Sequence, residues 1–165
     1  MTQAVLPIRL FATLVVFWVL LAGSLAPETI AVGVVVSAAI AWFFRNGLSY
    51  LAGYRMTPAS FGATVGFVGY FLAELVKANF EMARLVLSPA LPIDPAIVKA
   101  RTRLANPVAR LLLANAITLT PGTLTVEIEG DWLFIHWVSA KSTDPQVATD
   151  EIVAGFEHYL EKMYG

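Results

Sequence analysis

The chain has 165 residues, of which 58% are hydrophobic and 14% are charged, and its formal net charge is -1. Because a typical soluble protein is roughly 45–50% apolar and about 25% charged, this composition indicates a membrane protein. The sequence contains no cysteine, which excludes disulfides, thiolate catalysis and cysteine-ligated metals. The near-neutral charge also gives no general attraction to nucleic acid.

Charged residues are distributed unevenly along the chain. Before residue 74 the only charged side chains are Arg9, Glu28, Arg45 and Arg55, whereas charges recur every few residues afterwards. This contrast predicts a lipid-embedded first half and a water-facing second half. The predicted order is transmembrane helices over 1–87, with the third extending out of the membrane, then a linker over 88–95 and a soluble α+β domain over 96–165.

Three apolar runs lie in the first half, over residues 10–26, 27–44 and 56–73. Each has roughly 17 or 18 residues, the lower end of what crosses a hydrocarbon core of about 30 Å. We interpret the first two as a tight helical hairpin rather than a cleaved signal peptide, because the second run begins almost at once. A re-entrant hairpin remains an alternative.

Small residues repeat at helical spacing in the second and third runs. Such stripes allow close approach of another backbone, on which helix association in lipid depends. The alternative is that they only pack helices of this chain on each other. The predicted partner-helix interface consists of Gly33, Ser37 and Ala41 in the second run, and Gly62, Gly66, Gly69 and Ala73 in the third.

The third run continues as a helix into more polar sequence, up to residue 87. Glu74 lies where the apolar run ends, and an acidic residue there could take part in proton transfer. Pairing with Lys77, three residues later, is the simpler interpretation.

The second half begins with a predicted strand over 96–102. Asn106 is a suitable N-cap and Pro107 a suitable first residue for a short helix that runs to Leu119. In the Thr120-Pro121-Gly122-Thr123 segment that follows, proline and glycine occupy the central positions that a type II turn requires.

A hairpin is predicted next. In residues 123–129, Leu124, Val126 and Ile128 alternate with polar residues, which predicts an apolar face on the core and a wet face. Gly130-Asp131 form a two-residue turn. The returning segment, 132–138, is apolar on both faces, so it is either a central strand covered on both sides or one whose outer face docks on something else.

A final helix, capped by Asp144 before Pro145, carries an apolar stripe at Ile152, Phe156, Leu160 and Met163. Its acidic residues, Glu157 among them, are assigned to the polar face. Strand, helix, hairpin and helix predict a βαββα unit resembling a truncated ferredoxin-like fold.

Catalytic motifs are not found: the sequence has no phosphate-binding glycine loop, nucleophile elbow or HExxH pattern. We therefore expect no enzyme activity and no cofactor. One alternative is a self-sufficient transporter, which would need polar groups along a pore. Another is a membrane-anchored binding or sensor module, whose sheet domain would capture a soluble partner.

The segment LLLANAITLTPGTLTVEIEGDWLFIHWV, residues 111–138, resembles the E-type subunits of the multisubunit Na⁺(K⁺)/H⁺ antiporters, the Mrp/Mnh/Pha family. The resemblance covers nearly the whole chain, and its most specific part is the NxITLTPGT run. Ala116 stands where many relatives have serine. The residues that match the family motif are Asn106, Pro107, Asn115, Thr118, Thr120, Pro121, Gly122, Thr123, Gly130 and Asp131.

The resemblance implies an accessory subunit of a bacterial inner-membrane complex that exchanges Na⁺ or K⁺ for H⁺. It implies other integral membrane subunits and the lipid bilayer as partners, no nucleic acid, and a cytoplasmic C-terminal domain. With three spans, however, Arg9, Arg45 and Arg55 would not all lie inside the cell. Two spans with an interfacial third segment would satisfy these charges better. We nevertheless retain three membrane segments, since large partners can override weak loop charges.

Overall fold

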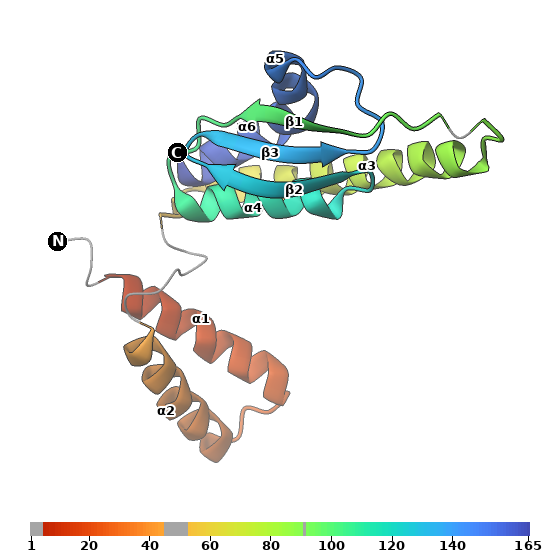
Figure 1. The fold of residues 1–165 in the computed structure, drawn as a ribbon. Coiled ribbons are helices and arrows are strands. Elements are labelled where there is room, and N and C mark those ends of the chain that lie inside the picture. Colours follow the sequence, from red (N-terminus) through yellow and green to blue (C-terminus); the bar gives the residue numbers. More distant parts are fainter. Residues whose placement is uncertain (1–4, 45–52, 91) are drawn as a thin grey trace. The chain divides into compact units, whose positions relative to one another are not determined.

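The computed structural model describes residues 5–44, 53–90 and 92–165 (Figure 1). The chain divides into two compact units, Met1–Gly53 and Tyr54–Gly165, which are described separately.

The first unit is a helical hairpin formed by α1 (Val5–Ala22) and α2 (Pro27–Phe43). Gly23, in the turn, has a φ of +60°, a conformation that suits glycine. Pro27 begins α2, where a missing amide hydrogen costs nothing. The indole Nε1 of Trp18 on α1 donates a hydrogen bond to the carbonyl oxygen of Thr29, at 2.9 Å. The predicted hairpin is therefore formed.

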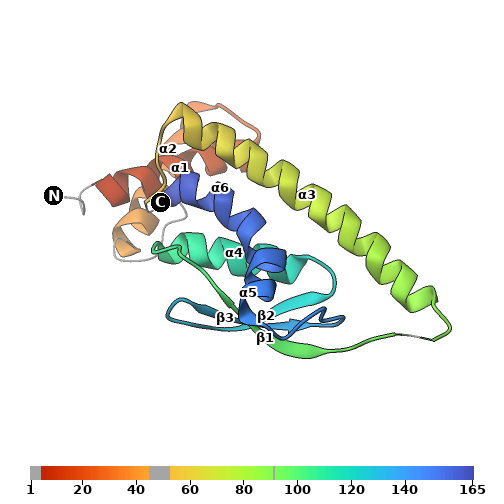
Figure 2. The same ribbon diagram turned by 90° about the horizontal axis from the view of Figure 1, so that it is seen from above.

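The second unit has three layers, which Figure 2 shows from above. A three-stranded antiparallel sheet forms one layer, helices α4 and α6 form the middle layer, and α3 packs on α6 on the far side. Its elements are α3 (Pro58–Leu87), β1 (Ala96–Arg101), α4 (Pro107–Leu119), β2 (Thr123–Glu129), β3 (Trp132–Trp137), α5 (Pro145–Ala148), the π-helical turn η1 (Thr149–Val153) and α6 (Ala154–Tyr164).

The sheet has the order β1-β3-β2. Val98 of β1 pairs with Ile135 of β3, and both side chains are buried against the helical layer. Leu133, Leu113 and Leu160 are fully buried in the same core, contributed by β3, α4 and α6. The chain is thus mostly helical with a small antiparallel sheet, and its elements follow the predicted order.

Two expectations for this unit are wrong. A bulge between Thr125 and Glu127 breaks the alternation of β2. Thr125 therefore turns inward, where its hydroxyl donates to the carbonyl of Ala114 at 3.2 Å, and Leu124 and Val126 are about half exposed rather than in the core. Glu157, assigned from its spacing to the polar face of the last helix, is 2% exposed.

The long helix α3 begins at Pro58, two residues later than predicted, because the Thr57 hydroxyl caps it by accepting a hydrogen bond from the amide of Ser60. Among the described helices, only α3 is long and apolar enough to cross a membrane by length and composition; α1 and α2 are apolar but shorter. Packing places α3 in the unit that contains the sheet, whereas the boundary predicted from charge falls after residue 87. The three-span organisation stays a prediction.

Candidate functional site

The small-residue stripe on α2 packs against α1. Gly33, Ser37 and Ala41 are all buried. A Cβ atom on Gly33 would lie 2.2 Å from the Trp18 ring, so glycine is required there for the two helices to approach. The intrachain alternative therefore accounts for this stripe in the structure, and its contact with a neighbouring protein stays a prediction.

The residues of the stripe on α3 differ in what surrounds them. A Cβ on Gly66 would lie 2.7 Å from the Tyr159 ring of α6, whereas a Cβ on Gly62 or Gly69 would have no atom within 4 Å. The contact at Gly66 is repeated in the opposite sense, because a Cβ on Gly155 of α6 would lie 2.0 Å from the Tyr70 hydroxyl of α3. A tyrosine of each helix thus packs against a glycine of the other. The sequence did not indicate this reciprocal contact, because the two helices are distant along the chain.

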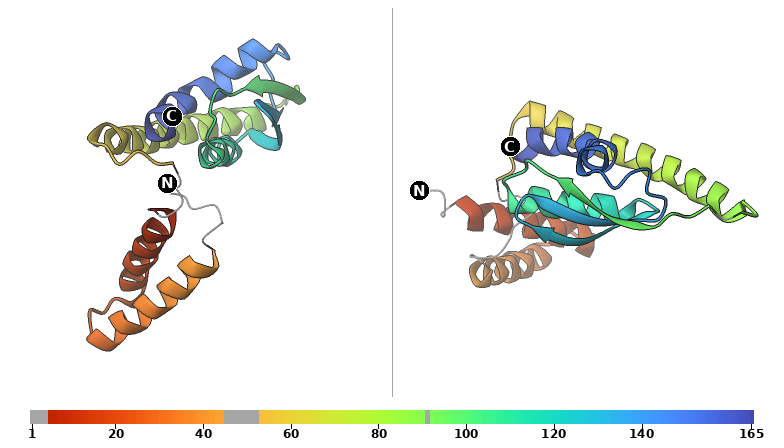
Figure 3. Two further views of the ribbon diagram at one scale, coloured as in Figure 1. Left: turned by 90° about the vertical axis from the view of Figure 1, so that its left-hand side faces the viewer. Right: turned by 45° about the horizontal axis from the view of Figure 1, so that its top comes forward.

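Three views show α3 and α6 side by side (Figures 2 and 3). Around the two glycines the contact is aromatic: the rings of Tyr70 and Phe156 have centroids 5.0 Å apart, and those of Phe67 and Phe156 6.1 Å apart. At the start of α3, the Ser60 hydroxyl donates to the carbonyl of Lys162 at 3.1 Å. Of the predicted stripe on α3, only Gly62, Gly69 and Ala73 remain exposed.

Most of the family-motif residues lie at the start of α4 or in its connection to β2. Asn106 caps α4 by accepting hydrogen bonds from the amides of Val108 and Ala109. The amide of Thr123 donates to the carbonyl of Thr120 at 3.2 Å, and Gly122 has a φ of +94°. These are the closing bond and the glycine conformation of a type II turn.

Two further threonines fasten this connection. Thr118 Oγ1 accepts a hydrogen bond from the amide of Thr125, and the Thr123 hydroxyl donates to the carbonyl of Ile117 at 2.7 Å. Asn115 is exposed on α4. Most of the polar residues of the motif thus hold the backbone in place instead of converging on a ligand.

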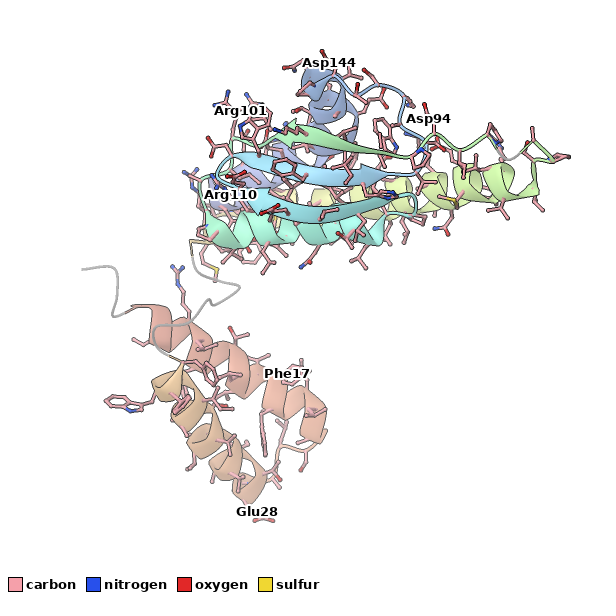
Figure 4. The ribbon with its side chains drawn as sticks, viewed as in Figure 1. Phe17, Glu28, Asp94, Arg101, Arg110 and Asp144 are labelled. Atoms are coloured by element: carbon pink, nitrogen blue, oxygen red, sulfur yellow. The ribbon has the colours of Figure 1, made fainter. Side chains whose placement is uncertain are left out.

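The hairpin turn between β2 and β3 is held by a residue of α4 that the sequence pattern did not single out. Arg110 of α4 donates through its guanidinium to the carbonyl oxygens of Leu104 and Gly130, and to the carboxylate of Asp131 at 2.7 Å. Figure 4 shows Arg110 at this end of the sheet. Gly130 has a φ of +57°, as its position in the turn requires. The arginine was recognisable only as a charge near a helix start.

A cavity of about 320 Å³ lies between the second half of α3, the α4–β2 turn, the end of β3 and η1. It brings together Glu74 and the turn residues 120–123, which the sequence had indicated separately. Its walls include the apolar side chains of Met82, Ile117 and Phe156. The hydroxyl of Ser139, which also lines the cavity, is buried and has no hydrogen-bond partner among the described residues.

Four of the five charged residues that line this cavity form two ion pairs. Lys77 lies 3.4 Å from Glu74, as the sequence predicted, and Lys141 lies 2.6 Å from Glu151. The hydrogen bond from Lys141 lowers the pKa of Glu151 below its usual value, and Lys77 adds to the effect. The paired Glu74 carboxylate gives no support to a role in proton transfer.

A second polar site lies beneath β1. The buried carboxylate of Glu157 accepts hydrogen bonds from the Thr102 hydroxyl at 2.6 Å and from the Arg103 amide at 2.7 Å. The Arg103 side chain lies 3.4 Å from the same carboxylate. Glu157 therefore satisfies the backbone at the end of β1, a structural task.

The outer face of the sheet is not covered by any described helix of this unit. Cross-strand rows on it combine a cation, an aromatic ring and a carboxylate: Lys99, Phe134 and Glu127 in one row, and Arg101, Trp132 and Glu129 in the next. The returning strand β3 is central in the sheet, as one interpretation required, but it is not covered on both sides within this unit. That its outer face docks on something else stays a prediction. Within the described residues there is no group of three histidine or acidic side chains that could hold a metal ion.

Comparisons with known proteins give a consistent result. A family model described as a Na⁺/H⁺ ion antiporter subunit matches residues 11–163. The E-type Na⁺/H⁺ antiporter subunit of Alkalihalophilus pseudofirmus is 30% identical over 142 residues, covering 85% of this chain and 87% of that protein. The E1-type Na⁺/H⁺ antiporter subunit of Staphylococcus aureus is 28% identical over 139 residues, covering 80% and 82%.

A solved structure also resembles the chain. It belongs to the membrane-bound sulfane sulfur reductase, an archaeal respiratory membrane complex, and matches with a TM-score of 0.81 and 34% identity. The match covers 97% of this chain and 98% of that one.

Proposed function

Because the chain belongs to the family of Na⁺/H⁺ ion antiporter subunits, among its E-type members, we propose that it serves as the accessory subunit that helps to assemble a cation/proton antiporter. The resemblance noted in residues 111–138 is confirmed. The chain is thus a membrane-bound subunit of a multisubunit antiporter, and its partners are the other subunits. The complex would move Na⁺ or K⁺ out of the cell in exchange for H⁺.

The structural role is supported by what the described side chains do. In helices α1 and α2 the only charged residues are Arg9 and Glu28, near the ends of the hairpin segments, so a path for ions would have to be supplied by other subunits. In the second unit, the polar motif residues hold turns and caps. Gly62, Gly69 and Ala73, which are exposed on α3, are the residues we propose for contact with a neighbouring helix.

The unit of the sheet would lie on the cytoplasmic side of the membrane. Its strand and helix order, with a helical layer on one face of the sheet, is also what a relation to ferredoxin-like folds would require. Its uncovered sheet face is then available to cytoplasmic parts of the complex.

A second host complex is favoured by one observation. The structural match at 34% identity spans nearly the whole chain and comes from a respiratory membrane complex. A respiratory membrane complex is therefore the second host that we propose for the chain. The role of the chain itself, contact with membrane neighbours, would be the same.

Isolation of the tagged chain from its native membrane in mild detergent tests both proposals. Several multi-span proteins in fixed ratio, without redox subunits, support the antiporter. Redox subunits in the same fixed ratio support the respiratory complex. A chain that comes alone, from cells in which its neighbours are expressed, contradicts the subunit role and would direct attention to soluble ligands of the sheet.

A further inference from the structure

One face of α3 is apolar over its full length and points away from the rest of its unit. Phe61, Val65, Val68 and Leu72 on this face are each about half exposed or more. The same face continues through Val76, Phe80 and Val86, which are 55%, 64% and 65% exposed. At 1.5 Å per residue the 30-residue helix is about 45 Å long. The exposed apolar face therefore does not stop where the charges of the sequence begin.

The charged residues of α3 lie on other sides of the helix. At 100° per residue, Glu74, Lys77, Glu81 and Arg84 all project about 100° or more from the centre of the row formed by Val65, Leu72 and Val76. The polar residue within that row, Asn79, donates its side-chain amide to the carbonyl of Leu75 on the same helix, at 2.7 Å. Lipid could therefore cover the row without leaving a formal charge in hydrocarbon.

The first half of α3 is flanked by a charged helix of the same unit. The amide of Arg55 donates to the carbonyl of Met163, and the Tyr159 ring occupies the space that a side chain at Gly66 would need. Helix α6 therefore lies beside residues 55–70, the segment that a spanning α3 would place in the bilayer. Glu161, whose side chain is 44% exposed, and the exposed Lys162 would enter the membrane with it.

We propose that α3 lies along the membrane surface as an interfacial helix and does not cross the bilayer, with lipid covering the apolar face centred on Val65, Leu72 and Val76. Gly62, Gly69 and Ala73 lie about 40–80° to one side of that centre, where a neighbouring helix can pack beside the lipid-covered row. A spanning α3 would place Glu161 and Lys162 near hydrocarbon, and would leave Val76, Phe80 and Val86 in water. An interfacial α3 avoids both costs, because its apolar face reaches lipid over its full length and α6 stays on the watery side. Length and composition alone do not distinguish these arrangements.

The charges of the sequence agree with this topology. If only α1 and α2 cross, Arg9 near the start of α1 shares one side with Arg45 and Arg55, which follow the hairpin, while Glu28 lies at the opposite end. That is the distribution expected when the arginines face the cytoplasm. The N-terminus and the unit of the sheet would then lie on the same side, whereas a spanning α3 would separate them.

The sidedness of two sites decides between the topologies. Since the chain has no cysteine, Thr143→Cys in the exposed loop before α5 and a cysteine in an N-terminal tag can each be labelled alone by a membrane-impermeant maleimide. The experiment uses the full chain expressed with its neighbours, in oriented vesicles. Labelling of both from the same side is expected. Labelling from opposite sides would overturn the proposal. Leu25→Cys, in the α1–α2 turn, marks the other side.

The depth of three spin labels tests the lipid contact itself. Val65→Cys, Leu72→Cys and Phe80→Cys lie on the outer face, and an interfacial helix places them at equal, shallow depth with high oxygen accessibility. In a spanning helix, residues 65 and 80 would differ in depth by about 22 Å. Immobile labels that neither oxygen nor a water-soluble relaxant reaches would show that a neighbouring protein covers the face, which would also overturn the lipid contact. Thr143→Cys serves as the water-exposed control.

Sidedness and co-purification are independent readouts. Loss of the expected neighbours would contradict the proposed function, on which the interfacial orientation of α3 does not depend. Opposite sidedness within an intact complex would contradict only the orientation.

Discussion

At the scale of single residues, the contact between α3 and α6 depends on two tyrosine–glycine pairs. The Tyr70 hydroxyl occupies the space that a side chain at Gly155 would need, and the Tyr159 ring occupies that space at Gly66. Because packed interiors leave little room for adjustment, even one methyl group at these glycines should be felt.

Gly155→Ala should therefore destabilise the folded chain by about 1–3 kcal/mol, measured as a shift of the thermal unfolding transition in detergent. The control is Gly69→Ala on α3, where the added Cβ meets no atom and the better helix propensity of alanine should stabilise by roughly 0.5–1 kcal/mol. Adding Tyr70→Ala to Gly155→Ala should cost less than the sum of the two single changes. Additive effects would show that the ring and the glycine do not fit together.

Glu157 offers a second test at this scale. Glu157→Ala would leave the buried Thr102 hydroxyl and the Arg103 amide without their acceptor, which should cost about 3 kcal/mol of unfolding free energy. Glu161→Ala, one turn later, removes only a distant and exposed partner of Arg103 and should cost less than about 0.5 kcal/mol. Equal losses in the two variants would mean that the buried carboxylate is not what secures the end of β1.

At the scale of elements, the sequence predicted local features better than it predicted long-range packing. Caps and turns are properties of a few neighbouring residues, so Asn106, Asp144 and Gly122 indicated their structures directly. The bulge in β2 and the π-helical turn η1 insert one residue into a regular pattern, and no short stretch of sequence announces them. Glu157 was misassigned for a related reason, because helical spacing identifies a face but not the backbone that will cover it.

The α4–β2 turn can be tested through Gly122. Gly122→Val should destabilise the unit of the sheet by about 1–3 kcal/mol, since a β-branched residue is strained at a φ of +94°. Its Cβ would also press on the flexible end of Met82, at 3.1 Å. If Gly122→Val together with Met82→Ala unfolds at the temperature of the parent chain, contact and not backbone strain was the main cost.

The ion pair between Lys141 and Glu151 gives η1 a small pH dependence. Since the folded-state pKa of Glu151 is lowered, the pair stabilises the fold above the unfolded pKa of about 4.3, and this contribution is lost as pH falls through the folded-state pKa. Both side chains are about half exposed or more, so the contribution should stay below about 1 kcal/mol. Lys141→Met should lower the unfolding temperature slightly at pH 7, and by less as the pH falls toward 3. A difference of the same size at both pH values would rule out the ion pair as its source.

At the scale of the whole molecule, the family, the order of elements and the membrane character followed from the sequence, because composition and one specific motif carry them. The sequence did not predict which helices pack on the small-residue stripes, because the spacing identifies a face of small side chains but not the helix that contacts it. The structure assigns Gly33 and Gly66 to contacts within the chain and leaves Gly62 and Gly69 open.

Gly69→Leu should therefore leave the chain folded and weaken its retention in the complex, because the large side chain meets no atom of its own unit. The yield of co-purified neighbours should fall several-fold relative to the parent, while the unfolding temperature of the isolated chain stays within about 2 °C. The matched control, Val68→Leu, enlarges an already large lipid-facing side chain and should change neither. Normal retention of the Gly69→Leu variant would exclude this flank as a contact with a neighbouring protein.

The reciprocal seating of Tyr70 and Tyr159 has a mechanical consequence. For α3 to slide along α6, Tyr70 and Tyr159 would have to leave the spaces that they occupy beside Gly155 and Gly66. The two contacts therefore fix the register of α3 on α6. Displacement of α3 by a neighbour should therefore move α6, and through the contacts of α6 with α4 and of α4 with β2 it should reach the sheet and its open face.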